Sequence, residues 1–246
     1  MIIGSNIIYR EKVSSTNDSA SEMLRKKKLP EGTIIYAGLQ TNGRGQRGNT
    51  WISEAGKNLT ISIILYPDFL GSDQQFLISK LISLSISDLL KAYTSSISIK
   101  WPNDIYYKDD KIAGILIEYS LEGNMIQHCI AGVGININQL SFPPEIPNPV
   151  SLGKITRQEH DIDTVLSDFC RICDSWYKKL KEGRTDYIDD KYLKNIYMFN
   201  TPSVFRTNTG YFTGRITGID SFGRLLVEHE DGNKEAYGFR EIEFKD

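Results

Sequence analysis

Residues 100–138 read KWPNDIYYKDDKIAGILIEYSLEGNMIQHCIAGVGININ, and they contain the pattern around which the rest of the chain is organised. Two apolar runs, 111–119 and 125–137, flank the turn signal Glu122-Gly123-Asn124, which predicts a β-hairpin. A short strand is expected just before KWPND, at 97–100. The stretch therefore predicts a sheet built around this hairpin.

Similar patterns continue toward the N-terminus and beyond the hairpin. Apolar runs predict three more strands, at 6–10, 33–39 and 59–65. Helical spacing of apolar residues predicts helices after SSTN at 14–17, over 73–93 and 161–181, and a short one at 187–192. We expect Thr16 or Asn17 to cap the first of these helices.

The pattern changes after about residue 200. Short β-type runs separated by turn signals such as Thr209-Gly210 and Asp231-Gly232 succeed one another there. Strands at intervals of about 8–12 residues are typical of a small barrel. We therefore expect two domains, covering residues 1–199 and 200–246.

The composition is that of an ordinary globular protein. Hydrophobic residues make up 40% and charged residues 24%, which argues against disorder. The 29 basic and 31 acidic residues leave a net charge of −2, which argues against a strongly basic nucleic-acid binder. No apolar run approaches the ~20 residues of a membrane helix, and no signal peptide is recognised. A cytoplasmic location without a membrane partner is expected.

The cysteines indicate buried side chains rather than chemistry. Cys170 and Cys173 form a C-x-x-C, but the residues around them predict an amphipathic helix, and Cys129 stands alone. A redox pair usually opens a helix after a strand, and zinc needs ligand spacing that the three histidines lack. Free buried cysteines and no metal-ligating cluster are therefore expected.

The segment 43–48, GRGQRG, is the most conspicuous polar motif. It has the glycine spacing of a dinucleotide site, but such a motif must open a helix, whereas NTWISEAGKNLT follows here. Two interpretations remain. One is a flexible surface loop. The other is a loop that orders around an anion, with Arg44 and Arg47 available for phosphate or carboxylate.

KWPND places charges of both signs at the end of a strand. Lys100, Asn103 and Asp104 lie within five residues, which suits a catalytic corner. The alternative is a solvated turn with Trp101 anchored in the core. Lys111 opens the next strand, where a lysine is usually only solvated, and Gly114 indicates a close approach by a ligand or another backbone.

The combination and order of these motifs resemble the biotin protein ligases. The matching elements are SSTN (14–17), QTNGRGQRGNTW (40–51), KWPND (100–104), the lysine of KIAGIL (111–116) and GVGININ (132–138). The resemblance implies an α+β fold, with a mixed β-sheet flanked by helices and a small C-terminal SH3-like barrel. Because few residues precede the first strand, we expect neither the winged helix of some family members nor their repressor activity.

The resemblance also implies a two-step reaction. Biotin and ATP give biotinyl-5′-AMP, and a lysine of a biotin carboxyl carrier protein then takes the biotinyl group, with Mg²⁺ on the phosphates. The catalytic residues implied are Lys111, Arg44 and Lys100. Biotin is assigned to Ser15, Thr16, Asn17, Gln40, Gly43, Arg44, Gly45, Gln46, Lys111, Gly114 and Gly132. ATP and the adenylate are assigned to Arg44, Arg47, Trp51, Lys100, Asn103, Asp104 and Asn136.

Two departures and two alternatives accompany this interpretation. Gln46 and Asn49-Thr50 stand where family members often have basic residues, which predicts weaker retention of the adenylate. A lipoate-type ligase of the same fold is the nearest alternative, although SSTN with KWPND argues against it. A non-catalytic biotin sensor would need a DNA-binding module. We expect no DNA partner, and a homodimer is left open.

Overall fold

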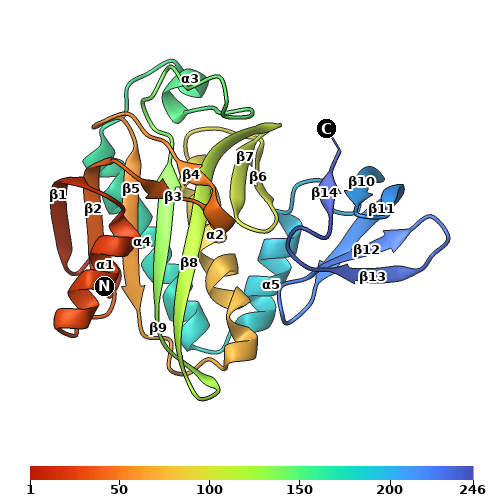
Figure 1. Ribbon diagram of the computed structural model, residues 1–246, viewed down its shortest axis with the longest axis horizontal. Coiled ribbons are helices and arrows are strands. Elements are labelled where there is room, and N and C mark those ends of the chain that lie inside the picture. Colours follow the sequence, from red (N-terminus) through yellow and green to blue (C-terminus); the bar gives the residue numbers. More distant parts are fainter. Residues whose placement is uncertain (246) are drawn as a thin grey trace.

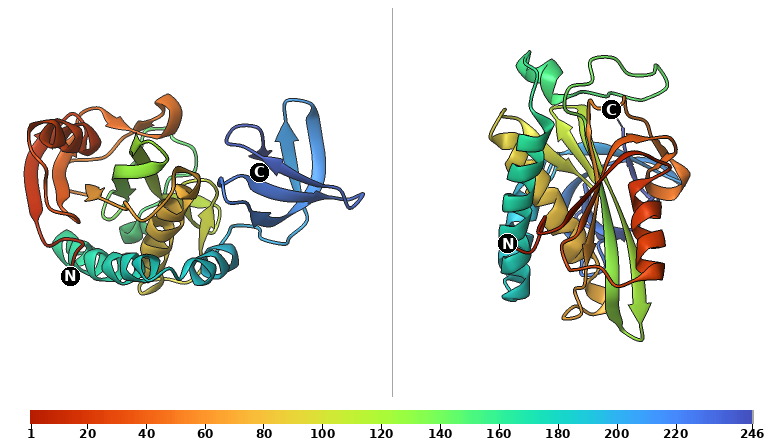
Figure 2. Two further views of the ribbon diagram at one scale, coloured as in Figure 1. Left: turned by 90° about the horizontal axis from the view of Figure 1, so that it is seen from below. Right: turned by 90° about the vertical axis from the view of Figure 1, so that its left-hand side faces the viewer.

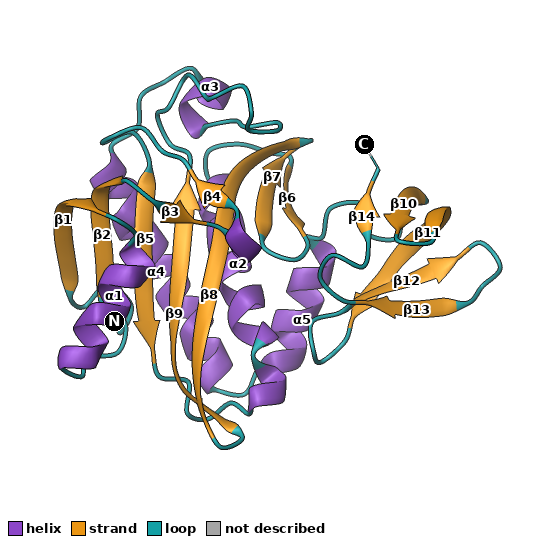
Figure 3. Ribbon diagram, viewed as in Figure 1, coloured by secondary structure: helices purple, strands orange, loops and turns teal. Residues whose placement is uncertain are grey.

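The computed structural model describes residues 1–245, except for the side chain of Arg47. It has an α+β fold with two main sheets (Figures 1 and 3). The larger sheet has seven strands in the order β1-β2-β5-β9-β8-β7-β6, and the C-terminal sheet has five in the order β13-β12-β11-β10-β14. The predicted fold class is therefore confirmed.

The elements alternate along the chain in a way that places helices on both faces of the larger sheet. Its strands are β1 (Ile7–Val13), β2 (Ile34–Gln40), β5 (Leu59–Leu65), β6 (Ile97–Lys100), β7 (Asp104–Tyr107), β8 (Asp110–Glu122) and β9 (Met125–Ile135). The helices are α1 (Thr16–Lys26), α2 (Phe76–Lys91), α3 (Leu152–Thr156), α4 (Ile162–Lys181) and α5 (Thr185–Lys194). The C-terminal sheet comprises β10 (Ser203–Thr207), β11 (Gly210–Ile219), β12 (Leu225–His229), β13 (Lys234–Tyr237) and β14 (Glu243–Phe244).

The β8–β9 hairpin and strands β5 and β6 agree with the sequence patterns, but the predicted helix cap was wrong and other local predictions were incomplete. The residue before α1 is Ser15, not Thr16 or Asn17, and its side chain makes no capping bond. Strand β7 and helix α3 were not expected, because each is too short for a periodic signal. The GRGQRG loop contains a two-residue strand pair, β3 (Gly43–Arg44) and β4 (Thr50–Trp51), around one short 3₁₀ turn.

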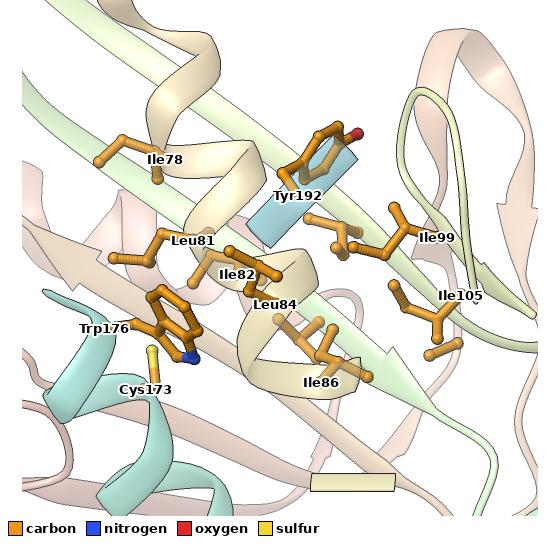
Figure 4. Close-up of a cluster of buried hydrophobic side chains, with 14 of the residues drawn as sticks. Ile78, Leu81, Ile82, Leu84, Ile86, Ile99, Ile105, Cys173, Trp176 and Tyr192 are labelled. Carbon is orange, nitrogen blue, oxygen red and sulfur yellow. The ribbon is translucent and has the colours of Figure 1, made fainter. Parts of the chain in front are cut away.

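Two apolar clusters fill the space between the sheet and its helices. Helices α2 and α4 cover one face and α1 covers the other (Figure 2). On the first face, Leu81 and Ile86 of α2 meet Ile105 of β7 and Trp176 of α4 (Figure 4). The smaller cluster lies beneath α1. Because both faces are covered, all seven residues of β5 are buried, including the two polar residues Thr60 and Ser62, whose hydroxyls are hydrogen-bonded.

The C-terminal sheet packs directly against the KWPND turn. The indole N–H of Trp101 donates to the carbonyl of Gly223 at 2.9 Å, and the rings of Trp101 and Phe239 lie 5.3 Å apart. Gly223 has a φ of +84° and lies against Phe76, so a side chain there would clash. Trp101 is thus anchored in the core, as expected from the interpretation of KWPND as a turn with a buried tryptophan. The domain boundary at 199/200 stays a prediction.

The three cysteines are free and buried, as predicted. Burial raises the pKa of the Cys170 thiol to about 11 and that of Cys173 to about 12. Such thiols carry almost no thiolate at neutral pH and are poor nucleophiles. Among the described residues, none of the helices is long and apolar enough to cross a membrane.

Asp174 of α4 ties down the N-terminal segment. Its carboxylate accepts hydrogen bonds from the backbone N–H groups of Ile2 and Ile3 and pairs with Lys178 at 2.9 Å. Burial alone raises the pKa of Asp174, but Lys178 and the two N–H groups outweigh it and hold the pKa below its usual value. The folded chain therefore favours the ionised carboxylate.

We predict that Asp174→Ala lowers the free energy of unfolding by about 1–3 kcal/mol at neutral pH, because it leaves N–H groups unpaired. Urea denaturation measures the loss. The contribution of Asp174 is complete above the pKa of the unfolded carboxyl, and it is lost as the pH falls through the lower pKa of the folded state. The gap between the two proteins should therefore shrink in acid.

Asp168→Ala is the matched control on the same helix. Its carboxylate pairs with Arg171, but the Asp168 side chain is 40% exposed, so the loss should stay below about 0.5 kcal/mol. Equal stability of the Asp174→Ala variant and the unmodified protein at neutral pH would contradict the proposed anchor.

Candidate active site

A cavity of about 570 Å³ lies between the start of α1, the GRGQRG loop, β8, β9 and the C-terminal sheet. It gathers most of the residues that sequence reasoning assigned to ligands. Those that line it are Ser15, Thr16, Asn17, Gln40, Arg44, Gly45, Gln46, Trp51, Lys100, Asn103, Asp104, Lys111, Gly114 and Gly132. Gly43 and Asn136 are not among the lining residues. The side chain of Arg47 lies outside the part of the chain that the structure describes.

One end of the cavity is built from neutral polar groups at the start of α1. Ser15, Thr16 and Asn17 are each 3% exposed. The backbone N–H and the hydroxyl of Thr16 both donate to Oε1 of Gln40, at 2.7 and 3.1 Å. These bonds fix the amide of Gln40, and Thr16 is the first residue of the helix rather than its cap.

Asn17 is held from three sides. Its Nδ2 donates to Glu118 at 2.7 Å and to the carbonyl of Leu116 at 3.3 Å, and its Oδ1 accepts from Ser62 at 2.5 Å. A Cβ on Gly132 would lie 2.5 Å from Oδ1 of Asn17. Gly132 is therefore required for Asn17 to reach this position.

The other end of the cavity holds cations. Lys111 at the start of β8 pairs with Asp104 of the neighbouring β7 at 2.7 Å, and it lies 5.9 Å from the ring centre of Trp51. The Lys111 side chain is 31% exposed, so its ammonium lies at the wall of the cavity rather than in the core. Asp104 thus fixes the position of the lysine.

Lys100 is surrounded by aromatic rings. Its ammonium donates to the hydroxyl of Tyr106 at 3.3 Å and lies 4.6 Å from that ring centre. Phe244 of β14 and Tyr197 lie 5.3 and 5.6 Å away, so the C-terminal sheet supplies part of the environment of this lysine. Cation–π attraction of this kind helps to position an ammonium.

Arg44 is engaged by two carboxylates. Its Nη1 and Nη2 donate to the two oxygens of Glu118 at 2.9 and 2.7 Å, and Nη2 also lies 2.8 Å from Asp18. The hydrogen bond to Glu118 raises the pKa of Arg44. These two carboxylates offset the charge of Arg44 within the GRGQRG loop.

Trp51 covers a part of the sheet that carries no side chains. A Cβ on Gly134 would lie 2.4 Å from Cε2 of Trp51, and one on Gly114 would lie 3.0 Å from Cζ3. The β3–β4 pair carries Trp51 onto β8 and β9 (Figure 1). Gly43 has a structural part here, because a Cβ would lie 2.4 Å from the carbonyl oxygen of Trp51.

Two predicted adenylate residues are committed to the protein itself. Nδ2 of Asn136 donates to the carbonyl of Val150 at 3.0 Å, so its assignment to the adenylate gains no support from the structure. Nδ2 of Asn103 donates to the carbonyl of Ile115 at 2.9 Å, although Asn103 does line the cavity.

Sequence reasoning missed several residues around the cavity. Glu118 was part of an apolar strand pattern, and its isolation as a carboxylate among apolar neighbours was the signal. Asp18 lies in the first turn of α1, where an acidic residue is common, so its pairing with Arg44 had no distinctive signal in the sequence. Phe239 and Phe244 of the C-terminal sheet also line the cavity, and no local pattern connects them with residues so far away in the chain.

The comparisons with known proteins agree with this geometry. Residues 9–136 match the biotin/lipoate A/B protein ligase family, and residues 204–244 match the biotin protein ligase C-terminal domain. The bifunctional ligase/repressor BirA of Bacillus subtilis is 32% identical, over 96% of this chain and 73% of that protein. The biotin–[acetyl-CoA-carboxylase] ligase of Paracoccus denitrificans is 28% identical, over 91% and 94%.

Solved structures give the same result in three dimensions. The biotin protein ligase of Aquifex aeolicus, in complex with biotin and ATP, superposes with a TM-score of 0.81 at 28% identity, over 98% of this chain and 99% of that one. A structure of that protein without ligand gives 0.75 at 26% identity. The match thus includes the sheet, its helices and the C-terminal strands. Together, the family match over more than half of the chain and the 32% identity show that the chain belongs to the biotin/lipoate A/B protein ligase family.

Proposed function

We propose that the protein activates biotin with ATP as biotinyl-5′-AMP and transfers the biotinyl group to a lysine of a biotin carboxyl carrier protein. The observation that carries the proposal is one cavity with neutral amides and hydroxyls at one end and two lysines at the other. The named biotin ligases among its relatives, and the Aquifex structure with biotin and ATP, support the choice of substrates.

The neutral end suits the ureido ring of biotin. That ring offers two N–H donors and one carbonyl acceptor, and it is uncharged. Hydroxyl and amide partners satisfy such groups without burying an unpaired charge. Ser15, Thr16, Asn17 and Gln40 supply them. The bare backbone at Gly114 and Gly132 lets Trp51 and Asn17 lie close against the sheet, where both side chains line the cavity.

The cationic end suits the reacting anions. A carboxylate oxygen of biotin attacks the α-phosphorus of ATP, the bond to the bridging oxygen breaks, and pyrophosphate leaves with that electron pair. Lys111 holds the carboxylate and the α-phosphate together and stabilises the charge that develops, while Lys100 faces the same end. The carrier lysine then attacks the acyl carbon, AMP leaves, and the amine loses its proton.

Magnesium fits this arrangement only as a partner of the phosphates. Among the described residues, no cluster of three or more histidine, cysteine, aspartate and glutamate side chains could bind a metal. Mg²⁺ usually keeps several waters and uses one or two carboxylates with substrate phosphates. Asp104 is the carboxylate next to Lys111 and is the candidate to hold it. The ion would offset phosphate charge when bound.

The remaining expectations about partners stay predictions. These are the absence of repressor activity and of DNA binding, the carrier protein as acceptor, and the location of the protein in the cytoplasm. The relatives named ligase/repressor extend beyond the aligned region, since the alignment covers 73% of their length.

Incubation with biotin, ATP and Mg²⁺ tests the function directly. We expect release of pyrophosphate and formation of biotinyl-AMP, followed by biotinylation of an added carrier domain. Lipoate in place of biotin is the parallel reaction, and the ureido partners at the cavity should make it the poorer substrate. Turnover of lipoate but not of biotin would replace this proposal with the lipoate alternative.

We predict that Lys111→Ala reduces the rate of adenylate formation by about 10²–10³-fold, because one fixed charge on the transition state is lost. Biotin affinity should change less, since neutral groups hold the ring. Pyrophosphate release and calorimetry measure the two effects. Lys154→Ala, which removes an exposed cation from α3, is the control and should leave both unchanged. A Lys111→Ala enzyme with normal turnover would refute this role.

Gln46 lines the cavity and offers only a neutral amide. A charge-assisted hydrogen bond is roughly twice as strong as a neutral one. We therefore predict that Gln46→Arg slows the release of biotinyl-AMP and reduces diffuse biotinylation of bystander proteins. Gln158→Arg adds the same charge at an exposed position and should have no effect. The measurement is the dissociation rate of biotinyl-AMP at equal salt, and an equal or faster rate for Gln46→Arg speaks against the prediction.

A further inference from the structure

The carboxylate of Glu118 is the point at which two parts of the cavity meet. It accepts from Asn17 of the neutral end, at 2.7 Å, and from both terminal nitrogens of Arg44 in the GRGQRG loop, at 2.9 and 2.7 Å. Glu118 lies on β8, two residues after Leu116, and side chains at this spacing share one face of a strand. Leu116 lines the cavity, whereas Glu118 lies just outside the lining.

The contact with Glu118 determines what Asn17 can offer a ligand. Both hydrogens of Nδ2 are used, one by Glu118 and the other by the carbonyl of Leu116. Oδ1 accepts from Ser62 and retains capacity for one more donor. Asn17 therefore meets a ligand as an acceptor. Without a carboxylate at position 118, the amide could turn over within almost the same shape and present its NH₂ group instead.

The same contact determines what Arg44 can offer. Two carboxylates, Glu118 and Asp18, face its guanidinium, so this cluster carries no surplus positive charge. Nε of Arg44 is buried and has no hydrogen-bond partner among the described residues. A buried unpaired donor is costly. With its charge offset by two carboxylates, Arg44 is suited to fix the position of its loop rather than to supply net positive charge.

We propose that Glu118 is a positioning residue for biotin, which orients the amide of Asn17 as an acceptor for a ureido N–H and holds Arg44, with its loop, against the cavity. The inference rests on the proposed function. It assigns biotin selection partly to a residue that does not itself line the cavity.

Because the side chains of Glu118 and Arg44 are partly exposed, a positioning role of Glu118 can be distinguished from a contribution to the stability of the fold. The side chains of Glu118 and Arg44 are 39% and 37% exposed. Ion pairs this accessible to water contribute little to folding. Loss of Glu118 should therefore change ligand binding and the loop while leaving the thermal unfolding midpoint nearly unchanged.

Glu118→Gln tests the proposal with almost no change of shape. It replaces one acceptor oxygen with an NH₂ group that faces donors, so either Asn17 or Arg44 must turn away. We expect the KM for biotin to rise about 10- to 100-fold, as for a lost buried hydrogen bond, and the KM for ATP to stay within about twofold. Hydrogen exchange of residues 41–51 in the ligand-free protein should become faster.

Two further variants complete the test. Glu118→Asp keeps a carboxylate that only accepts, so it should recover part of the biotin affinity that Glu118→Gln loses. Glu122→Gln is the matched control on the same strand. Its carboxylate is exposed and accepts only from Gln127, at 3.3 Å, among the hydrogen bonds of the described residues, so both KM values and the loop exchange should stay unchanged.

The outcomes separate this proposal from the proposed function. An unchanged KM for biotin in Glu118→Gln overturns the positioning role of Glu118 in biotin binding while leaving biotin ligation in place. An unmodified protein that neither binds nor activates biotin overturns the proposed function. In that case the exchange of residues 41–51 still tests the hold on Arg44: faster exchange in Glu118→Gln supports it, and unchanged exchange refutes it.

Discussion

The cavity depends on a strip of bare backbone in the β8–β9 hairpin. At Gly114, Gly132 and Gly134 no side chain rises from the sheet, and Trp51 and Asn17 occupy the space that results. Any Cβ at Gly132 or Gly134 would lie within 2.5 Å of those side chains. Since strands elsewhere in the sheet are filled with isoleucine, valine and leucine, the glycines mark where packing of the core gives way to binding. The loop, the helix start and the lysines are all arranged around that strip.

The three cations Lys111, Arg44 and Lys100 have different surroundings in the cavity. Lys111 is paired with one carboxylate, Arg44 faces two, and Lys100 lies among aromatic rings. The three cations that looked equivalent in the sequence are therefore different chemically. Lysines can approach anions as compact charges, whereas a guanidinium held by carboxylates contributes directed N–H groups. The division matches a substrate that is neutral at one end and anionic at the other.

The sequence predicted the elements with strong periodicity and the motifs with distinctive residues, and the structure brings most of those motifs into one cavity. It did not predict the partners that decide what each motif does. Glu118 followed an apolar pattern, and β7 was too short to have one. Phe244 reaches Lys100 only through tertiary packing. Thr16 or Asn17 was expected to cap the helix, but both lie inside it, and their donors bond to Gln40 and Glu118.

The C-terminal strands supply part of the cavity wall, so the site is complete only when segments from both ends of the chain have come together. Ser15 and Phe239, near opposite ends of the chain, line the same cavity. Bringing together residues so far apart in the chain costs more loop-closure entropy than pairing near neighbours does. The buried cluster around α2 and α4 likewise extends from Ile3 to Ile242, so the core and the cavity both join the two ends of the chain. Opening of the C-terminal strands would remove Phe239 and Phe244 from the cavity wall.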